Sequence, residues 1–211
     1  MDAREEKRLI LTSWTYLLGR LELAGDELAN FAIRQLRGLA QRVDESSFPP
    51  LRADELAPDL ARRLLGLRKL VDDATARSGK DGFISTKGLR VTPRPTGYGR
   101  YLLLEGVDAW FGLDFALWAR GSYPATPLWL VLAEDDWTKN LAKARVALKR
   151  WIHESQPRCF DEGSRVLVPI NLPQGVEYEA VLDSVVEQLR SVANELRRFW
   201  EIEQHEEHSE A

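Results

Sequence analysis

The stretch that decides the fold is YLLLEGVDAWFGLDF, residues 101–115. Its two halves are short, apolar and aromatic, and Gly106 stands between them. Short apolar runs bounded by turn residues are typical of β-strands, and a glycine between two such runs is compatible with a tight hairpin. We therefore predict strands over residues 101–106 and 109–115 that pair as an antiparallel hairpin.

Two further strands are predicted downstream of this hairpin. PLWLVLA (127–133) is apolar throughout, and SRVLVPINLP (164–173) is a second apolar run that contains Pro169. Because proline cannot donate a hydrogen bond to a neighbouring strand, Pro169 favours an edge position or a bulge. The segment as a whole predicts an antiparallel meander of about four or five strands.

Helices are predicted on both sides of the strands, because apolar residues there recur at spacings of three and four. Three such stripes fill a helical segment over residues 1–76, and Pro58 fits only the first turn of the third helix. The remainder, 77–211, carries the strands, a basic helix over 139–152 and a long helix that begins near residue 177. The predicted fold class is α+β, with the long C-terminal helix packed on the sheet and both segments in one compact unit.

Composition narrows the class of protein. Of 211 residues, 44% are hydrophobic and 29% are charged, as in a globular chain rather than a disordered one. The net charge of −4 means that any attraction to nucleic acid must come from a local patch. Cys159 is the single cysteine, which excludes an internal disulfide and a thiolate zinc site and fits a reducing compartment. With no apolar run of about 18 residues and a charged start, MDAREEKRLI, we expect a cytoplasmic protein with no membrane partner.

Acidic residues at strand ends are the candidates for catalysis. Glu134, Asp135 and Asp136 follow the strand over 127–133, and Asp114 ends a neighbouring strand. Oxygen ligands of this kind hold Mg²⁺, so Asp114, Glu134 and Asp136 are the candidate catalytic residues of a metal-dependent hydrolase or nuclease. The preferred interpretation is simpler: the acids precede the next helix, whose positive end they stabilise. No cofactor and no metal site are predicted.

Basic residues offer a candidate surface for nucleic acid. They lie in the Gly- and Pro-rich loop over 77–100 and in the helix over 139–152, where cations could meet phosphates and tyrosines could stack on bases. The alternative is an ordinary solvated face. The candidate nucleic-acid-binding residues are Lys87, Arg90, Arg94, Tyr98, Arg100, Lys143, Lys149 and Arg150.

A protein partner is the other candidate. An apolar stripe exposed on the first or last helix would pair with another chain or with a second copy, because large exposed apolar patches mark interaction surfaces.

Five segments together resemble a known module. They are STKGLRVTP (85–93), GYGRYLLLEG (97–106), AWFGLDFALWA (109–119), TPLWLVL (126–132) and VLVPINLPQGVEYEAVLDSVVEQLRSVANEL (166–196). They resemble a C-terminal module of bacterial proteins in the PD-(D/E)XK nuclease superfamily, which implies an accessory to a nuclease core in proteins linked with defence against foreign DNA.

The core of that superfamily has an Asp on one strand and Glu-x-Lys on the next, and this chain departs from the pattern. The nearest pair is Asp114 with Glu134, and position 136 is Asp rather than Lys, so no catalytic residue carries over. We therefore expect a non-catalytic accessory or binding module in a bacterial system that handles nucleic acid. The alternatives are a metal-dependent hydrolase or nuclease and a protein-interaction subunit.

Overall fold

The computed structural model of the protein describes residues 53–86, 96–120, 122–133 and 140–209, together with Leu18 and Leu36. The chain divides into two compact units, Met1–Leu56 and Ala57–Ala211. In the first unit, Leu18 and Leu36 are helical and a 3-10 helix, η1, covers Ala53–Leu56; the other residues of the predicted N-terminal helices lie outside the described part. Within the described residues, no helix has the length and apolarity that a membrane crossing requires.

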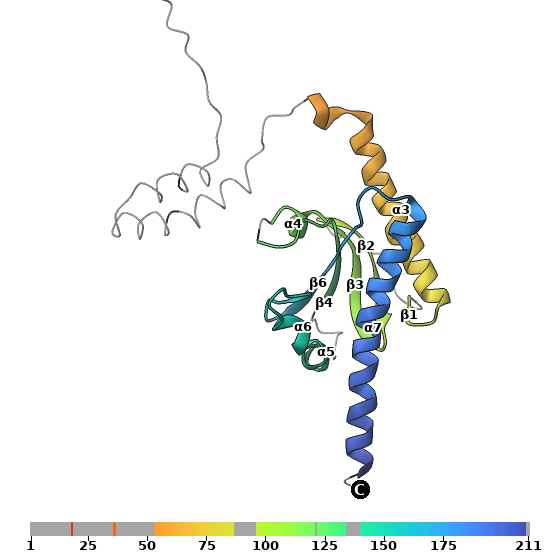
Figure 1. Ribbon diagram of the computed structural model, residues 1–211, viewed down its shortest axis with the longest axis vertical. Coiled ribbons are helices and arrows are strands. Elements are labelled where there is room, and N and C mark those ends of the chain that lie inside the picture. The colour runs from red at the N-terminus through yellow and green to blue at the C-terminus, as the bar shows by residue number, and fades with distance from the viewer. Residues whose placement is uncertain are drawn as a thin grey trace, which may run out of the picture. The chain divides into compact units, whose positions relative to one another are not determined.

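The second unit is built on a sheet whose described residues form six antiparallel strands in the order β1-β2-β3-β4-β6-β5 (Figure 1). The strands are β1 (Ile84–Ser85), β2 (Gly97–Leu104), β3 (Val107–Asp114), β4 (Leu128–Ala133), β5 (Phe160–Asp161) and β6 (Arg165–Ile170). The antiparallel meander is confirmed. The count exceeds the predicted one because the two edge strands, β1 and β5, have only two residues each.

The central hairpin forms as predicted. Leu104 pairs with Val107, and the two residues between them, Glu105 and Gly106, have φ angles of 47° and 78°. Positive φ at both turn positions is the geometry of a type I′ hairpin, which matches the twist of the strands it joins. β2 begins earlier than expected, at Gly97, because this residue lies directly against β3: a Cβ atom there would be 1.9 Å from the Leu113 carbonyl oxygen.

Helices cover one face of the sheet, where the main hydrophobic core lies (Figure 1). They are α3 (Pro58–Lys80), α5 (Leu141–Ala147), α6 (Lys149–Ile152) and α7 (Tyr178–Ser209). α3 begins with Pro58 in its first turn, as expected. Its later residues Leu70, Val71 and Ala74 are buried against the sheet, so α3 belongs to the second unit, which starts at Ala57 rather than at the predicted residue 77.

The long C-terminal helix packs on the sheet, which confirms the α+β fold class. The buried stripe of α7 recurs at spacings of three and four, through Val185, Leu189, Val192 and Leu196. This is the pattern of a helix with one apolar face.

The opposite face of the sheet has a smaller cluster around two tryptophans, Trp110 and Trp129. The Trp110 ring lies over two glycines that pair across β2 and β3, since a Cβ atom on Gly99 would be 2.5 Å from the ring and one on Gly112 would be 2.8 Å from it. Pro169 stands in β6 beyond the residues that pair with β5, so β4 is its only strand neighbour in the described sheet. The predicted edge character of Pro169 therefore applies locally.

Candidate functional site

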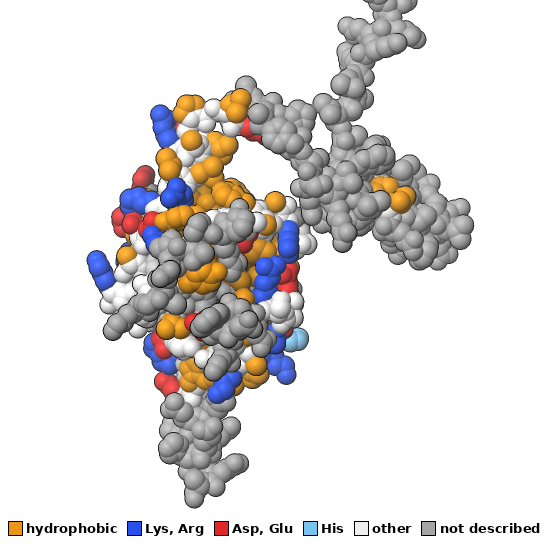
Figure 2. All heavy atoms as spheres, turned by 180° about the vertical axis from the view of Figure 1, so that it is seen from behind, with side chains coloured by type: hydrophobic (Ala, Val, Ile, Leu, Met, Phe, Trp, Pro, Cys, Tyr) orange, Lys and Arg blue, Asp and Glu red, His pale blue; other side chains and the backbone are white. Residues whose placement is uncertain are grey.

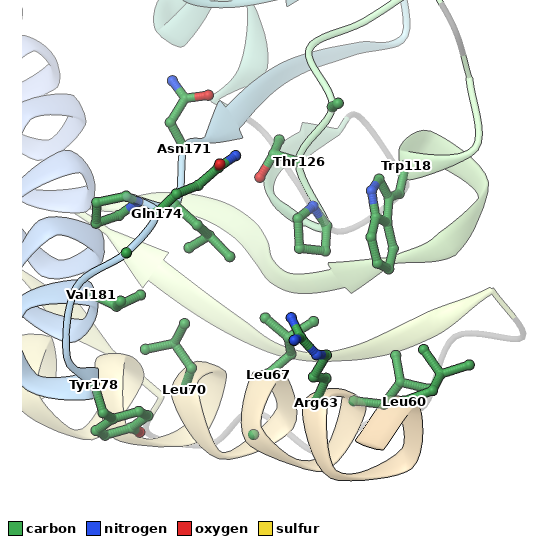
Figure 3. A pocket seen from close by; sticks show the side chains of 17 residues that line it. Leu60, Arg63, Leu67, Leu70, Trp118, Thr126, Asn171, Gln174, Tyr178 and Val181 are labelled. Carbon is green, nitrogen blue, oxygen red and sulfur yellow. The ribbon is translucent and has the colours of Figure 1, made fainter. Parts of the chain in front are cut away.

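A large hollow lies at the end of the sheet where β2 and β4 begin and β3 and β6 end. Its volume is about 820 Å³. In Figure 3, α3 forms one wall; Trp118, Thr126 and the turn over 171–175 form the opposite one. We call this hollow the α3 groove.

The α3 wall is apolar because the helix extends beyond the sheet that buries its second half. Leu60, Leu64 and Leu67 follow one another at spacings of four and three, so they share one side of the helix and line the groove. Leu60 is 41% exposed, although the same helix buries Leu70 almost completely. Figure 2 shows hydrophobic side chains gathered where the first half of α3 meets the body of the unit. The first half of α3 therefore presents a leucine stripe to solvent.

Trp118 is positioned by a short helix, α4 (Phe115–Trp118). Asp114 caps this helix: the Asp114 carboxylate accepts a hydrogen bond of 3.0 Å from the Leu117 amide, and the residue is only 3% exposed. The Phe115 amide donates to the carbonyl of Thr96 at 2.9 Å. These bonds hold Trp118, which is 38% exposed, with its ring pointing into the groove (Figure 3).

The turn between β6 and α7 is fixed by a side chain of α7. Gln188 pairs with the backbone of Asn171 as a neighbouring strand would: its oxygen accepts from the Asn171 amide at 2.8 Å, and its nitrogen donates to the Asn171 carbonyl at 2.8 Å. Thr126, which is buried, donates from its hydroxyl to the carbonyl of Ile170. The wall opposite α3 is thus held in place by hydrogen bonds that involve Asp114, Gln188 and Thr126.

One residue brings charge to the groove. Arg63 is the only ionised residue in its lining, and the Arg63 side chain rises from α3 between Leu60 and Leu67 (Figure 3). No carboxylate pairs with Arg63 within the described residues, whereas the adjacent Arg62 forms an ion pair of 2.8 Å with Asp59. The groove is therefore an apolar surface with a single, unneutralised positive charge.

Tyr178 closes the groove at the start of α7, and its hydroxyl is already engaged. It donates to Asp73 at 2.6 Å, while the Lys69 ammonium lies 4.5 Å from the ring centre. Burial and the bond to Asp73 raise the pKa of Tyr178. Hydrogen bonds from Lys69 and Tyr178 lower the pKa of Asp73 below its usual value. This cluster ties α3 to α7.

Of the three candidate catalytic acids the structure describes only Asp114, so their grouping into a site stays a prediction. Asp114 acts as a helix cap, while Glu134 and Asp136 lie outside the described residues. No group of three or more His, Cys, Asp or Glu side chains suited to a metal occurs in the part of the chain that the structure describes. The groove lining contains no Ser, Cys, His, Asp or Glu. The two side-chain hydroxyls of the lining, those of Thr126 and Tyr178, donate to the Ile170 carbonyl and to Asp73.

The first described group of nucleic-acid candidates lies against α3. The Tyr98 hydroxyl donates to Asp72 at 2.7 Å, and the Arg100 guanidinium pairs with the same carboxylate at 2.7 Å, which raises the pKa of Arg100. The Arg68 guanidinium lies 4.3 Å from the centre of the Tyr98 ring. These side chains already have partners within the fold.

The second described group lies on α5 and α6. Lys143 stands 5.2 Å from the Trp200 ring centre, Arg150 is 3.8 Å from Glu154, and Lys149 is exposed. Lys87, Arg90 and Arg94 fall outside the described residues. The structure thus shows two separate described groups of these candidates, one beside α3 and one on α5 and α6.

The cysteine does not supply a nucleophile. Cys159 is fully buried, its thiol donates to the Leu148 carbonyl at 3.9 Å, and burial raises its pKa to about 12. The charge of Arg158 lowers that pKa, as its position in sequence suggests, but burial outweighs it.

Sequence reasoning missed Arg63 and the groove. The leucine stripe of α3 is visible in sequence, but the sequence does not show that only its second half meets the sheet. The one local signal is Gly66, a residue without a side chain on a helix wall.

No protein-family model, curated protein or solved structure matches the chain. The resemblance to the module of nuclease-superfamily proteins therefore stays a prediction. Function is inferred below from the geometry of the groove.

Proposed function

We propose that the chain is a non-catalytic binding module whose α3 groove holds an amphipathic helix of a partner protein. The observation that carries this proposal is an apolar cavity of about 820 Å³ whose rim residues Leu60 and Trp118 stay in contact with solvent. A partner that covers them removes apolar surface from water, which stabilises the complex by roughly 25 cal/mol per Å² before the costs of association.

The shape of the α3 wall favours a helix as the occupant. Leu60, Leu64 and Leu67 form a ridge on α3 at helical spacing. A second helix can lay its own apolar residues beside such a ridge, with anchors at i, i+3 or i+4, and i+7. Because the wall opposite α3 is held by the Asp114 cap and by the hydrogen bonds of Gln188 to Asn171, that wall is formed before a partner arrives.

The accessory role expected from sequence agrees with a groove that binds without catalysing. Its nuclease-associated setting is part of the proposal and rests on the resemblance alone. Direct contact with nucleic acid is a separate prediction, which electrophoretic shift assays with single- and double-stranded DNA and RNA test. An absence of salt-sensitive binding at low ionic strength would contradict it.

A matched pair of variants tests the groove. Gly66 lines it, and a Cβ atom added there meets nothing within 4 Å, so Gly66→Trp fills the groove without a backbone clash. Leu65 is the neighbouring residue, is 61% exposed and does not line the groove, so Leu65→Trp is the control. Thermal unfolding of both variants verifies that each is folded.

The probe is a phage-displayed library of random peptides about 16 residues long, which is roughly four helical turns. We expect the wild-type chain to enrich peptides with apolar residues at helical spacing. Synthetic, fluorescently labelled versions should bind Gly66→Trp at least about tenfold more weakly, a difference of about 1.4 kcal/mol, and should bind Leu65→Trp as they bind the wild type. Enrichment of no peptide, or equal binding to Gly66→Trp, would contradict the proposal.

A further inference from the structure

We propose that the partner helix carries an acidic side chain beside its apolar face and that Arg63 selects the partner by pairing with that carboxylate. This inference rests on the proposed function and names the chemistry of its occupant.

The cations of α3 are Arg62, Arg63, Arg68, Lys69, Arg77 and Lys80. Arg62, Lys69 and Arg77 each form an ion pair with a carboxylate of the fold. Arg63, Arg68 and Lys80 form none with any described residue, and of these three only Arg63 lines the groove, which its side chain enters (Figure 3). The helix thus leaves one cation without a carboxylate partner at the docking surface.

A partner that covers the groove must compensate for the desolvation of the Arg63 guanidinium. Seating an apolar helix against Leu60 and Trp118 withdraws water from the Arg63 guanidinium, which lies in the same lining. A desolvated cation is costly unless an acceptor replaces the lost water, and a carboxylate does this best because it accepts two parallel hydrogen bonds from guanidinium. A basic partner would add like-charge repulsion.

The rest of the lining agrees with an acidic occupant. The groove contains no carboxylate that would repel one. A single cation is too little for a nucleic-acid backbone, whose binding depends on several neutralised phosphates. A helix with an apolar stripe and one flanking Asp or Glu satisfies both features of the groove.

The test uses the same random peptide library on three forms of the whole chain: wild type, Arg63→Glu and Arg62→Glu. Arg62 is the matched control because it lies next to Arg63 on α3 but pairs with Asp59 and does not line the groove. We expect wild-type and Arg62→Glu selections to be enriched in Asp and Glu. Arg63→Glu should instead enrich Lys and Arg. Dodecanoate is tested in parallel, because its carboxylate offers Arg63 the same chemistry on a small amphiphile.

A second measurement isolates the pair. An enriched peptide in which Gln replaces the acidic residue should bind the wild type about tenfold more weakly, but it should bind Arg63→Gln as well as the parent peptide does. Groove-dependent peptides with no acidic preference, and with unchanged binding to Arg63→Gln, would overturn this inference and leave the proposed function standing. Saturable binding of dodecanoate without any groove-dependent peptide would overturn the proposed function itself and assign the groove to a small amphiphile.

Discussion

Asp114 accepts a hydrogen bond of 3.0 Å from the backbone amide of Leu117. An acid at the end of a strand therefore caps the N-terminus of the helix α4. That helix ends at Trp118, which lines the α3 groove. The Asp114 amide also donates to the Pro127 carbonyl at 3.1 Å, so both sides of this junction are fixed. Because Asp114 caps the helix that positions Trp118, Asp114 contributes to the shape of the groove although it does not line it.

Replacing Asp114 should test the cap. Asp114→Ala removes the acceptor for the Leu117 amide and should lower the free energy of unfolding by about 1–2 kcal/mol. Asp114→Asn keeps a side-chain oxygen and should cost much less. Urea denaturation of both variants measures the difference. Equal stability of Asp114→Ala and wild type would show that the cap is unimportant.

Two glycines should respond in opposite directions to alanine. A Cβ atom on Gly112 would lie 2.4 Å from the Tyr98 carbonyl oxygen, so Gly112→Ala must shift β2 and should cost about 1–3 kcal/mol or more. Gly66 has open space around it in the middle of α3, so Gly66→Ala should stabilise the protein by up to about 1 kcal/mol through helix propensity. Thermal unfolding of the two variants side by side distinguishes them. A stabilising Gly112→Ala would mean that β2 and β3 are not this close.

Cys159 should react slowly in the native protein. With a pKa of about 12 and no exposed surface, its thiolate is scarce at pH about 8, and reagents cannot reach it. Labelling with a chromogenic disulfide should be complete within the mixing time in denaturant and slower by orders of magnitude without it. Rapid labelling of the folded chain would contradict the buried position.

The Asp73 cluster should contribute stability that depends on pH. Hydrogen bonds from Lys69 and Tyr178 lower the pKa of Asp73 below 3.8, so the folded state favours the ionised form. For a depressed pKa, the stabilisation is present above the unfolded pKa and is lost as the pH falls through the folded one. Asp73→Asn should therefore be less stable than wild type at neutral pH, and the difference should shrink at pH about 2, as measured by urea midpoints. A difference that stays constant between these two pH values would rule out ionised Asp73 as its source.

The features of the fold that sequence predicted are those with local signals. Residues 101–115 combine two apolar runs with Gly106 at the turn, and the hairpin follows from that pattern alone. The strands β1 and β5 were not predicted, because a strand of two residues is too short to show a periodic pattern in sequence. Each is defined by its pairing with a neighbouring strand in the folded sheet. Gly97 and Gly99 fall in the segment over 77–100 that was predicted as a loop, but they lie in β2, where atoms of β3 occupy the space that a side chain would fill.

The groove could not be predicted from sequence, because it forms between segments that are distant in the chain. The capping of a helix by strand-end acids was anticipated for Asp135 and Asp136, whereas the cap in the described structure is Asp114. Arg63 gave no signal because nothing in its neighbourhood in sequence differs from that of Arg62. Its distinction arises only from the side of α3 on which it lies and from where the sheet ends.

The claim that the α3 groove docks a partner helix is tested most directly by methyl NMR. Leucine and valine methyl spectra would be recorded as a peptide that prefers wild type to Gly66→Trp is added. The proposed docking predicts perturbed methyl resonances at Leu60, Leu64 and Leu67, and unchanged ones at Leu65 on the same helix. Perturbation at Leu65 with none at the three groove leucines would contradict it.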